Sequence, residues 1–124
     1  MSDINIKGTL KTPTILFKKS TNYLLIEGRS TLENPNKFYK PLISNLKDSM
    51  KSVSGTMEID FKLEYFNTTS SLAILDVLKH LLSLNTAKNK VVINWYYDEE
   101  DEDILEIGKD YSTIVNFPFN LVSN

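Results

Sequence analysis

Cysteine is absent from the 124 residues of this chain. Its absence excludes disulfide bonds, thiolate nucleophiles and cysteine metal ligands, and it suits a reducing cytosol. Arginine occurs only once, as Arg29, and the formal net charge is −2, so we expect no binding to nucleic acid. No apolar run approaches the roughly 20 residues of a membrane-spanning helix, and the first residues lack the apolar core of a signal peptide. We therefore expect a cytoplasmic protein without a membrane segment.

Residues that carry catalysis or metal binding are also scarce. The single histidine, His80, lies beside Lys79 in a segment predicted to be helical, and nothing in the sequence supports a catalytic triad. The acidic run at residues 98–103 lacks the spacing and the glycine of a calcium loop. We interpret it as a solvated turn and the negative first turn of a helix, with a further role in attracting or repelling a partner. The sequence thus predicts no enzyme activity, no cofactor and no metal.

Alternating patterns predict a sheet. Short strands are expected at residues 4–9, 14–17 and 23–27, the first two forming the start of an antiparallel arrangement. The clearest strand covers residues 56–66, where one face is apolar and the other charged, which predicts helices mainly on one face of the sheet. The apolar residues of this strand are Met57, Ile59, Phe61, Leu63 and Tyr65.

Helical spacing predicts the remaining elements. Asn34 and Pro35 are typical of a helix start, and Pro41 predicts a kink or a main helix that begins near it. A second helix is expected at about 71–84, a strand at 90–97, and a weaker helix from 101 to about 111, interrupted by Gly108, before an extended tail. Strands separated by helices must run parallel. We therefore predict an α/β (α+β) fold for residues 1–124, a single domain with a mixed sheet, an N-terminal antiparallel hairpin and two to three helices.

The most informative segment is the junction at residues 63–71, where the strand leads into four consecutive hydroxyl residues and then an apolar helix. Free N–H groups and the positive end of the dipole at a helix start both favour an anion. Three interpretations fit: helix capping alone, a bound phosphate-bearing ligand, or phosphate added to a hydroxyl. The hydroxyl residues are Thr68, Thr69, Ser70 and Ser71.

A second set of candidates lies near the carboxyl ends of the predicted strands. Arg29 is suited either to a surface ion pair or to receiving a phosphate. Aromatic residues gather at the same ends, and we expect about half in the core and the rest in a rim for protein recognition. The predicted partner-binding residues are Arg29, Glu64, Tyr65, Phe66, Asn67, Trp95 and Tyr97.

These motifs together resemble the SiaC family of bacterial regulatory phosphoproteins, nearly end to end. The resemblance rests on the junction at 63–71 and on several short motifs, and the chain departs from the common pattern at Thr31, Leu32, Thr69 and Leu72. The short motifs are Gly28-Arg29-Ser30, Glu33-Asn34, Phe38-Tyr39, Trp95-Tyr96-Tyr97, Asp101-Glu102-Asp103 and Pro118-Phe119.

The resemblance implies a protein similar in logic to the anti-sigma-factor antagonists of partner-switching systems. A dedicated kinase would phosphorylate Thr68, and a serine/threonine phosphatase would remove the phosphate. The unphosphorylated form would bind and activate an effector such as a diguanylate cyclase, which raises cyclic di-GMP and promotes biofilm formation. An alternative from the residues alone is a small module that binds an anion or phosphate ligand at the helix start formed by Thr68 to Ser71.

Overall fold

In a computed structural model, which describes residues 3–51 and 54–124, the chain forms one six-stranded sheet, three α-helices and a short 3-10 helix at Lys19–Thr21. The elements are β1 (Ile4–Ile6), β2 (Thr14–Lys18), β3 (Tyr23–Ser30), α1 (Asn36–Met50), β4 (Gly55–Phe66), α2 (Thr68–Leu82), β5 (Asn89–Tyr97), α3 (Glu102–Val115) and β6 (Asn120–Ser123).

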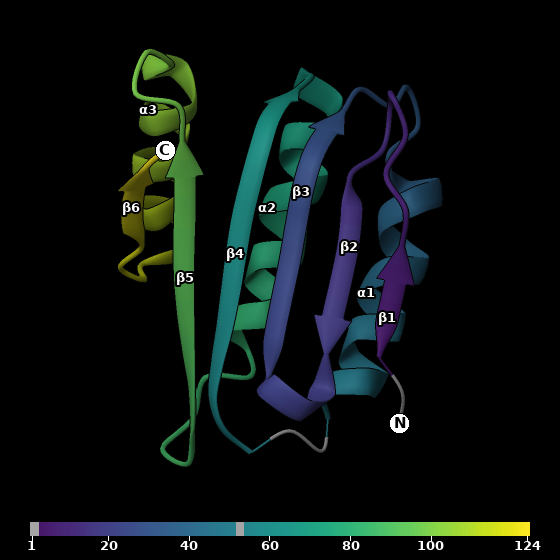
Figure 1. Cartoon of the computed structure of the whole chain (residues 1–124), viewed down its shortest axis with the longest axis vertical. Coiled ribbons are helices and arrows are strands. Elements are labelled where there is room, and N and C mark those ends of the chain that lie inside the picture. The colour runs from purple at the N-terminus through teal and green to yellow at the C-terminus, as the bar shows by residue number, and fades with distance from the viewer. Residues whose placement is uncertain (1–2, 52–53) are drawn as a thin grey trace.

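The strands lie in the sheet in the order in which they occur in the chain. β1, β2 and β3 are antiparallel neighbours, and β3 to β6 are parallel. Each parallel connection passes through a helix, and all three helices lie on the same face (Figure 1). This arrangement confirms the predicted mixed sheet with an antiparallel start. The tail that was expected to be extended adds β6 as a fourth parallel strand.

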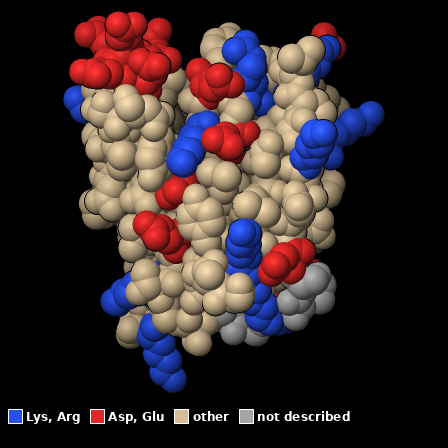
Figure 2. Space-filling view, in the orientation of Figure 1, with Lys and Arg blue, Asp and Glu red and all other residues tan. Residues whose placement is uncertain are grey.

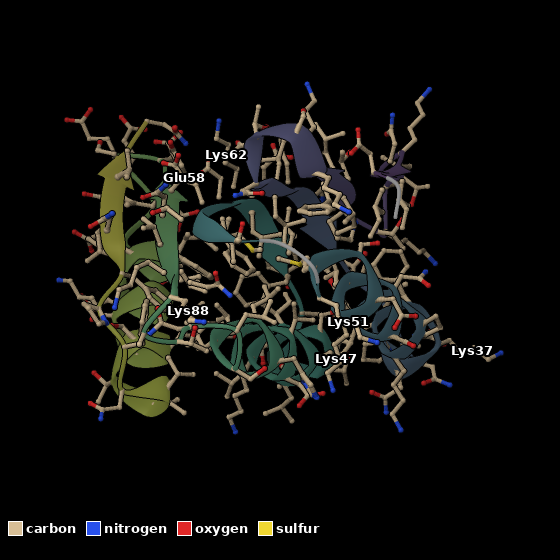
Figure 3. The ribbon with its side chains drawn as sticks, turned by 90° about the horizontal axis from the view of Figure 1, so that it is seen from below. Lys37, Lys47, Lys51, Glu58, Lys62 and Lys88 are labelled. Atoms are coloured by element: carbon tan, nitrogen blue, oxygen red, sulfur yellow. The ribbon has the colours of Figure 1, made fainter. Side chains whose placement is uncertain are left out.

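The two faces of the sheet differ in chemistry. The covered face and the helices form a continuous apolar core, in which Ile15, Phe17, Leu24 and Ile59 are completely buried. The opposite face is uncovered, and Figure 3 shows Glu58 and Lys62 on this side, away from the helices. The predicted alternation of β4 therefore holds along most of its length.

A hydrogen-bonded network crosses the uncovered face. Tyr23 donates to Asp60 Oδ2 over 2.6 Å, and Asn94 Nδ2 donates to Asp60 Oδ1 over 2.8 Å. Asn120 extends the network by donating to Asn94 Oδ1 over 2.9 Å. Burial and the hydrogen bond to Asp60 raise the pKa of the Tyr23 hydroxyl. The network joins β3 to β6 through side chains and satisfies a carboxylate that is only 6% exposed.

The start of α1 corrects the sequence prediction. The helix begins at Asn36 and continues through Pro41 to Met50, so no separate main helix starts near Pro41. The cap is Pro35, without a side-chain hydrogen bond, and the backbone N–H groups of Phe38 and Tyr39 donate to its carbonyl oxygen. Asn34 is therefore not the cap. Pro41 is the sixth residue of the helix, so α1 continues without the one backbone hydrogen bond that an N–H at this position would make to the carbonyl oxygen of Lys37.

Gly108 also behaves differently from the prediction. α3 runs through it without interruption, because the glycine packs directly on a buried tryptophan. A Cβ at position 108 would lie 2.5 Å from Trp95 Nε1, which donates to the carbonyl oxygen of Ile104 over 2.9 Å. Gly108 thus permits close approach of α3 to β5.

Candidate functional site

The junction between β4 and α2 is built around Asn67. Its backbone is extended, and its side-chain Oδ1 accepts a hydrogen bond of 3.0 Å from the N–H of Ser70. Its Nδ2 donates to the carbonyl oxygen of Leu32 over 3.1 Å. α2 therefore begins at Thr68, three residues earlier than its sequence pattern predicts, because the cap lies before the hydroxyl residues. Both polar atoms of the Asn67 side chain therefore make hydrogen bonds within the protein.

The four hydroxyl residues have different environments. Thr69 donates to the carbonyl oxygen of Leu32 over 2.8 Å, and Ser71 donates to that of Thr68 over 2.7 Å. Ser70 is completely buried. Thr68 is exposed, and its hydroxyl makes no side-chain hydrogen bond within the described parts of the chain. Thr68 is thus the exposed residue of the four whose hydroxyl, within the described residues, is not already bonded to a neighbour.

A chain of buried hydroxyls holds the start of α2 on the sheet. Tyr39 donates to Ser30 Oγ over 2.7 Å, and Ser30 donates to Ser70 Oγ over 2.9 Å. Burial raises the pKa of Tyr39 to about 12, against a smaller lowering by its bond to Ser30, so its hydroxyl keeps the proton that it donates at neutral pH. Sequence reasoning gave Ser30 and Tyr39 no role, because three separate elements supply this chain.

An irregularity in the pairing of β3 with β4 changes which side chains of β4 face the core near the junction. Gly28 pairs with Leu63, but Arg29 pairs with Tyr65, so Glu64 is an extra residue on β4. Gly28 has a φ of +118°, which favours glycine. Tyr65 is consequently 48% exposed, whereas the alternation predicted it on the apolar face. The Arg29 guanidinium lies over the Tyr65 ring, 5.2 Å from its centroid.

The aromatic residues divide between core and surface, as expected, but with different members in each. Trp95 is completely buried and Phe66 is 8% exposed, so these two predicted rim residues belong to the core. Tyr97 is half-buried and packs against the core. The predicted partner-binding residues with open side chains are therefore Arg29, Glu64 and Tyr65.

The acidic run forms a turn and the first turn of α3. Asp101 caps the helix, accepting from the N–H of Ile104 over 3.1 Å, and Glu102 and Asp103 follow in the first turn. Asp98 accepts from the N–H of Glu100 over 3.0 Å. This matches the predicted structural role. Within residues 3–51 and 54–124, no group of three His, Cys, Asp or Glu side chains is arranged to hold a metal ion.

The remaining candidate, His80, contacts its own helix. Its Nδ1 lies 2.8 Å from the carbonyl oxygen of Asp76 and 3.7 Å from the carboxylate of the same residue. These contacts are local to one turn of α2, which is the ordinary environment of a helical histidine. Among the helices that the described residues form, none has the length and apolar character to cross a membrane.

Sequence comparison finds known proteins that are similar to this chain along nearly its whole length. The model of the SiaC family regulatory phosphoproteins matches residues 6–124. A curated but uncharacterised protein of Pseudomonas aeruginosa (strain UCBPP-PA14) is 29% identical over 119 residues, which cover 96% of this chain and 94% of that protein.

Two solved structures are similar along almost their whole length. One is a chain from the complex of the diguanylate cyclase SiaD with its activator SiaC from Pseudomonas aeruginosa. It has a TM-score of 0.86 and 27% identity, and the match covers 98% of this chain and 100% of that one. The other is SiaC of the same organism, with a TM-score of 0.83, 25% identity and complete coverage of both chains.

Proposed function

Because this chain belongs to the SiaC family of regulatory phosphoproteins, we propose that it binds and activates a diguanylate cyclase and that phosphate on Thr68 controls this binding. The cyclase is proposed because the similar chain in the solved complex is an activator of such an enzyme. A cognate kinase adds the phosphate and a serine/threonine phosphatase removes it. The protein is then a switch and a substrate, and has no catalytic role of its own.

The observation that carries the proposal is the position of Thr68. It is the first residue of α2, its side chain is exposed, and the first turn contains no acidic residue. A phosphate there adds about −1.5 to −2 charges at the positive end of the helix dipole. The helix start tolerates this charge, so phosphorylation changes the surface that a partner meets without unfolding the protein.

The neighbouring hydroxyls support the choice of Thr68. A kinase must bring the acceptor oxygen into its own active site, and the buried Ser70 Oγ is out of reach in the folded protein. The Thr69 and Ser71 hydroxyls would each have to give up a hydrogen bond to a carbonyl oxygen. Thr68 requires neither unfolding nor the loss of a bond.

The first test is tandem mass spectrometry on the protein isolated from its host with phosphatases inhibited. The peptide spanning residues 64–79 should carry one phosphate, located on Thr68. A peptide that stays unmodified under several growth conditions, with full coverage, would contradict the proposed switch.

The second test measures activation of the host's diguanylate cyclase by purified protein. Thr68→Ala should activate like the wild type, and Thr68→Asp should activate weakly. Thr113→Asp is the matched control, because it places the same charge at an exposed position of α3. Equal activation by Thr68→Asp and Thr113→Asp would remove Thr68 from the mechanism.

A further inference from the structure

The backbone pairing between β4 and β5 stops before either strand ends. The paired residues run from Gly55 with Asn89 to Phe61 with Trp95, whereas β4 continues to Phe66 and β5 to Tyr97. Past that point β4 remains paired with β3, and β5 with β6, so the sheet divides (Figure 1). On alternate residues, the facing edges present backbone N–H and C=O groups without a partner strand. We call the space between these edges the notch.

The notch is a continuous groove across the end of the sheet. On the uncovered face of the sheet, the side chain of Lys62 reaches across the lower end of the notch. Its Nζ lies 4.6 Å from the centroid of the Tyr96 ring. Above this contact is an open cleft of about 820 Å³, and a second hollow of about 380 Å³ lies toward α3. Glu64, Asp101 and Asp103 line both. The buried side chains of Phe66 and Ile104 give the second hollow an apolar floor.

The walls of the notch are strongly acidic. Figure 2 shows the carboxylates gathered at the corner of the molecule above β5 and α3. The two cations that line the cleft, Arg29 and Lys62, both lie over tyrosine rings. The six carboxylates that line it are those of Glu64, Asp98, Glu100, Asp101, Glu102 and Asp103. Such a potential favours an occupant with lysine or arginine side chains.

We propose that the notch binds an extended, basic segment of the activated protein partner. The segment pairs with the free edge of β4 at residues 62–66 and places its basic side chains against the acidic turn, which is strand addition at an exposed edge. An extended segment fits better than a helix, because only an extended chain can satisfy the unpaired backbone groups of a strand. The assignment to the partner rests on the proposed function, but the docking itself requires no phosphate on Thr68.

Three blocked hexapeptides test the docking on the full-length, ¹⁵N-labelled protein by NMR. A peptide of alternating lysine and valine should shift the amide signals of residues 62–66 and slow their hydrogen exchange. A peptide of alternating glutamate and valine should leave them unchanged. A lysine–valine peptide with every backbone nitrogen methylated keeps the charge but has no N–H to donate, so it should affect only residues 98–103.

Two results would overturn the proposal. If the lysine–valine peptide leaves residues 62–66 unchanged, the notch does not bind a strand. If the methylated peptide affects those residues as strongly, the attraction is that of charge alone and strand pairing is excluded.

Charge-removing variants test the role of the acidic wall. Asp98→Asn combined with Glu100→Gln should weaken binding of the lysine–valine peptide by about tenfold. The matched control, Asp48→Asn with Asp110→Asn, removes two exposed carboxylates that do not line the notch and should leave binding unchanged. Equal weakening by both pairs would overturn a specific role for the acidic wall.

The same variants separate this inference from the proposed function. The notch variant should also lower activation of the host's cyclase, and normal activation by a variant that no longer binds the peptide would overturn the assignment to that partner. A Thr68→Asp protein that binds the peptide and activates normally would instead count against the phosphate switch alone.

Discussion

α2 and α3 begin in the same way but differ in charge. Both start after a parallel strand, and in both an Asn or Asp side chain accepts from a backbone N–H three residues later, at 3.0 Å for Asn67 and 3.1 Å for Asp101. The first turn of α3 contains Glu102 and Asp103, whereas that of α2 has no acidic residue. A helix start attracts anions. The dipole of α3 is already compensated by its own acidic residues, whereas the dipole of α2 favours an added negative charge.

The two starts are also fixed to the sheet at equivalent positions. In each helix the third residue is held from a strand: Ser30 donates to Ser70 Oγ, and Trp95 Nε1 donates to the carbonyl oxygen of Ile104. Because the start of α2 is held rigidly and its dipole is uncompensated, a modification there changes the local charge without changing the backbone. This difference between two similar sites explains why the phosphate is proposed at α2.

The largest effect is expected where α3 approaches the sheet. Gly108→Ala should lower the free energy of unfolding by about 1–3 kcal/mol, because the added methyl group overlaps Trp95, which is completely buried. Chemical denaturation followed by Trp95 fluorescence measures it. Lys109→Ala, at the next and exposed position, should have almost no effect. Equal stability of the two variants would show that the contact is not tight.

A similar loss is expected where α2 is held. Ser70→Ala removes the acceptor of the buried Ser30 hydroxyl, which should cost about 1–3 kcal/mol of unfolding free energy. Thr68→Ala, two residues earlier and exposed, should change stability by less than about 0.5 kcal/mol. Denaturation midpoints of the two variants provide the comparison. A larger loss for Thr68→Ala would mean that the exposed hydroxyl supports the helix start.

The smallest effects concern charge and should have opposite signs. Thr68→Glu adds a carboxylate at the first residue of α2 and should stabilise by about 0.3–1 kcal/mol at low salt, while Glu102→Gln removes one at the first residue of α3 and should destabilise by a similar amount. Both changes should shrink at high salt, because screening weakens exposed charges. Thermal unfolding at two salt concentrations measures them, and effects of the same sign would contradict the comparison.

The sequence predicts those features that depend on neighbouring residues. The alternation around Ile59 and Phe61 identifies β4, and helices between strands predict the parallel order. The run of hydroxyls places the candidate site at a helix start. By contrast, the exposure of Tyr65 depends on an irregularity in pairing with β3, which no local pattern reveals.

Other features depend on contacts between distant parts of the chain. Gly108 lowers helix propensity, yet α3 continues because the glycine lies against Trp95. Ser70 looks like one more hydroxyl of the candidate site until Ser30 and Tyr39, from β3 and α1, are seen to bury and bond it. Predicting either feature requires knowledge of the sheet register and of how a helix packs on the sheet.

The lengths of the strands have one more consequence. The outermost strands, β1 and β6, have three and four residues, whereas β4, in the interior of the sheet, has twelve. A copy of the protein that approached β1 or β6 would find few backbone groups on that strand with which to continue the sheet. Long, flat edges are the usual template for edge-to-edge aggregation, so the short outermost strands themselves offer little template for stacking into fibres.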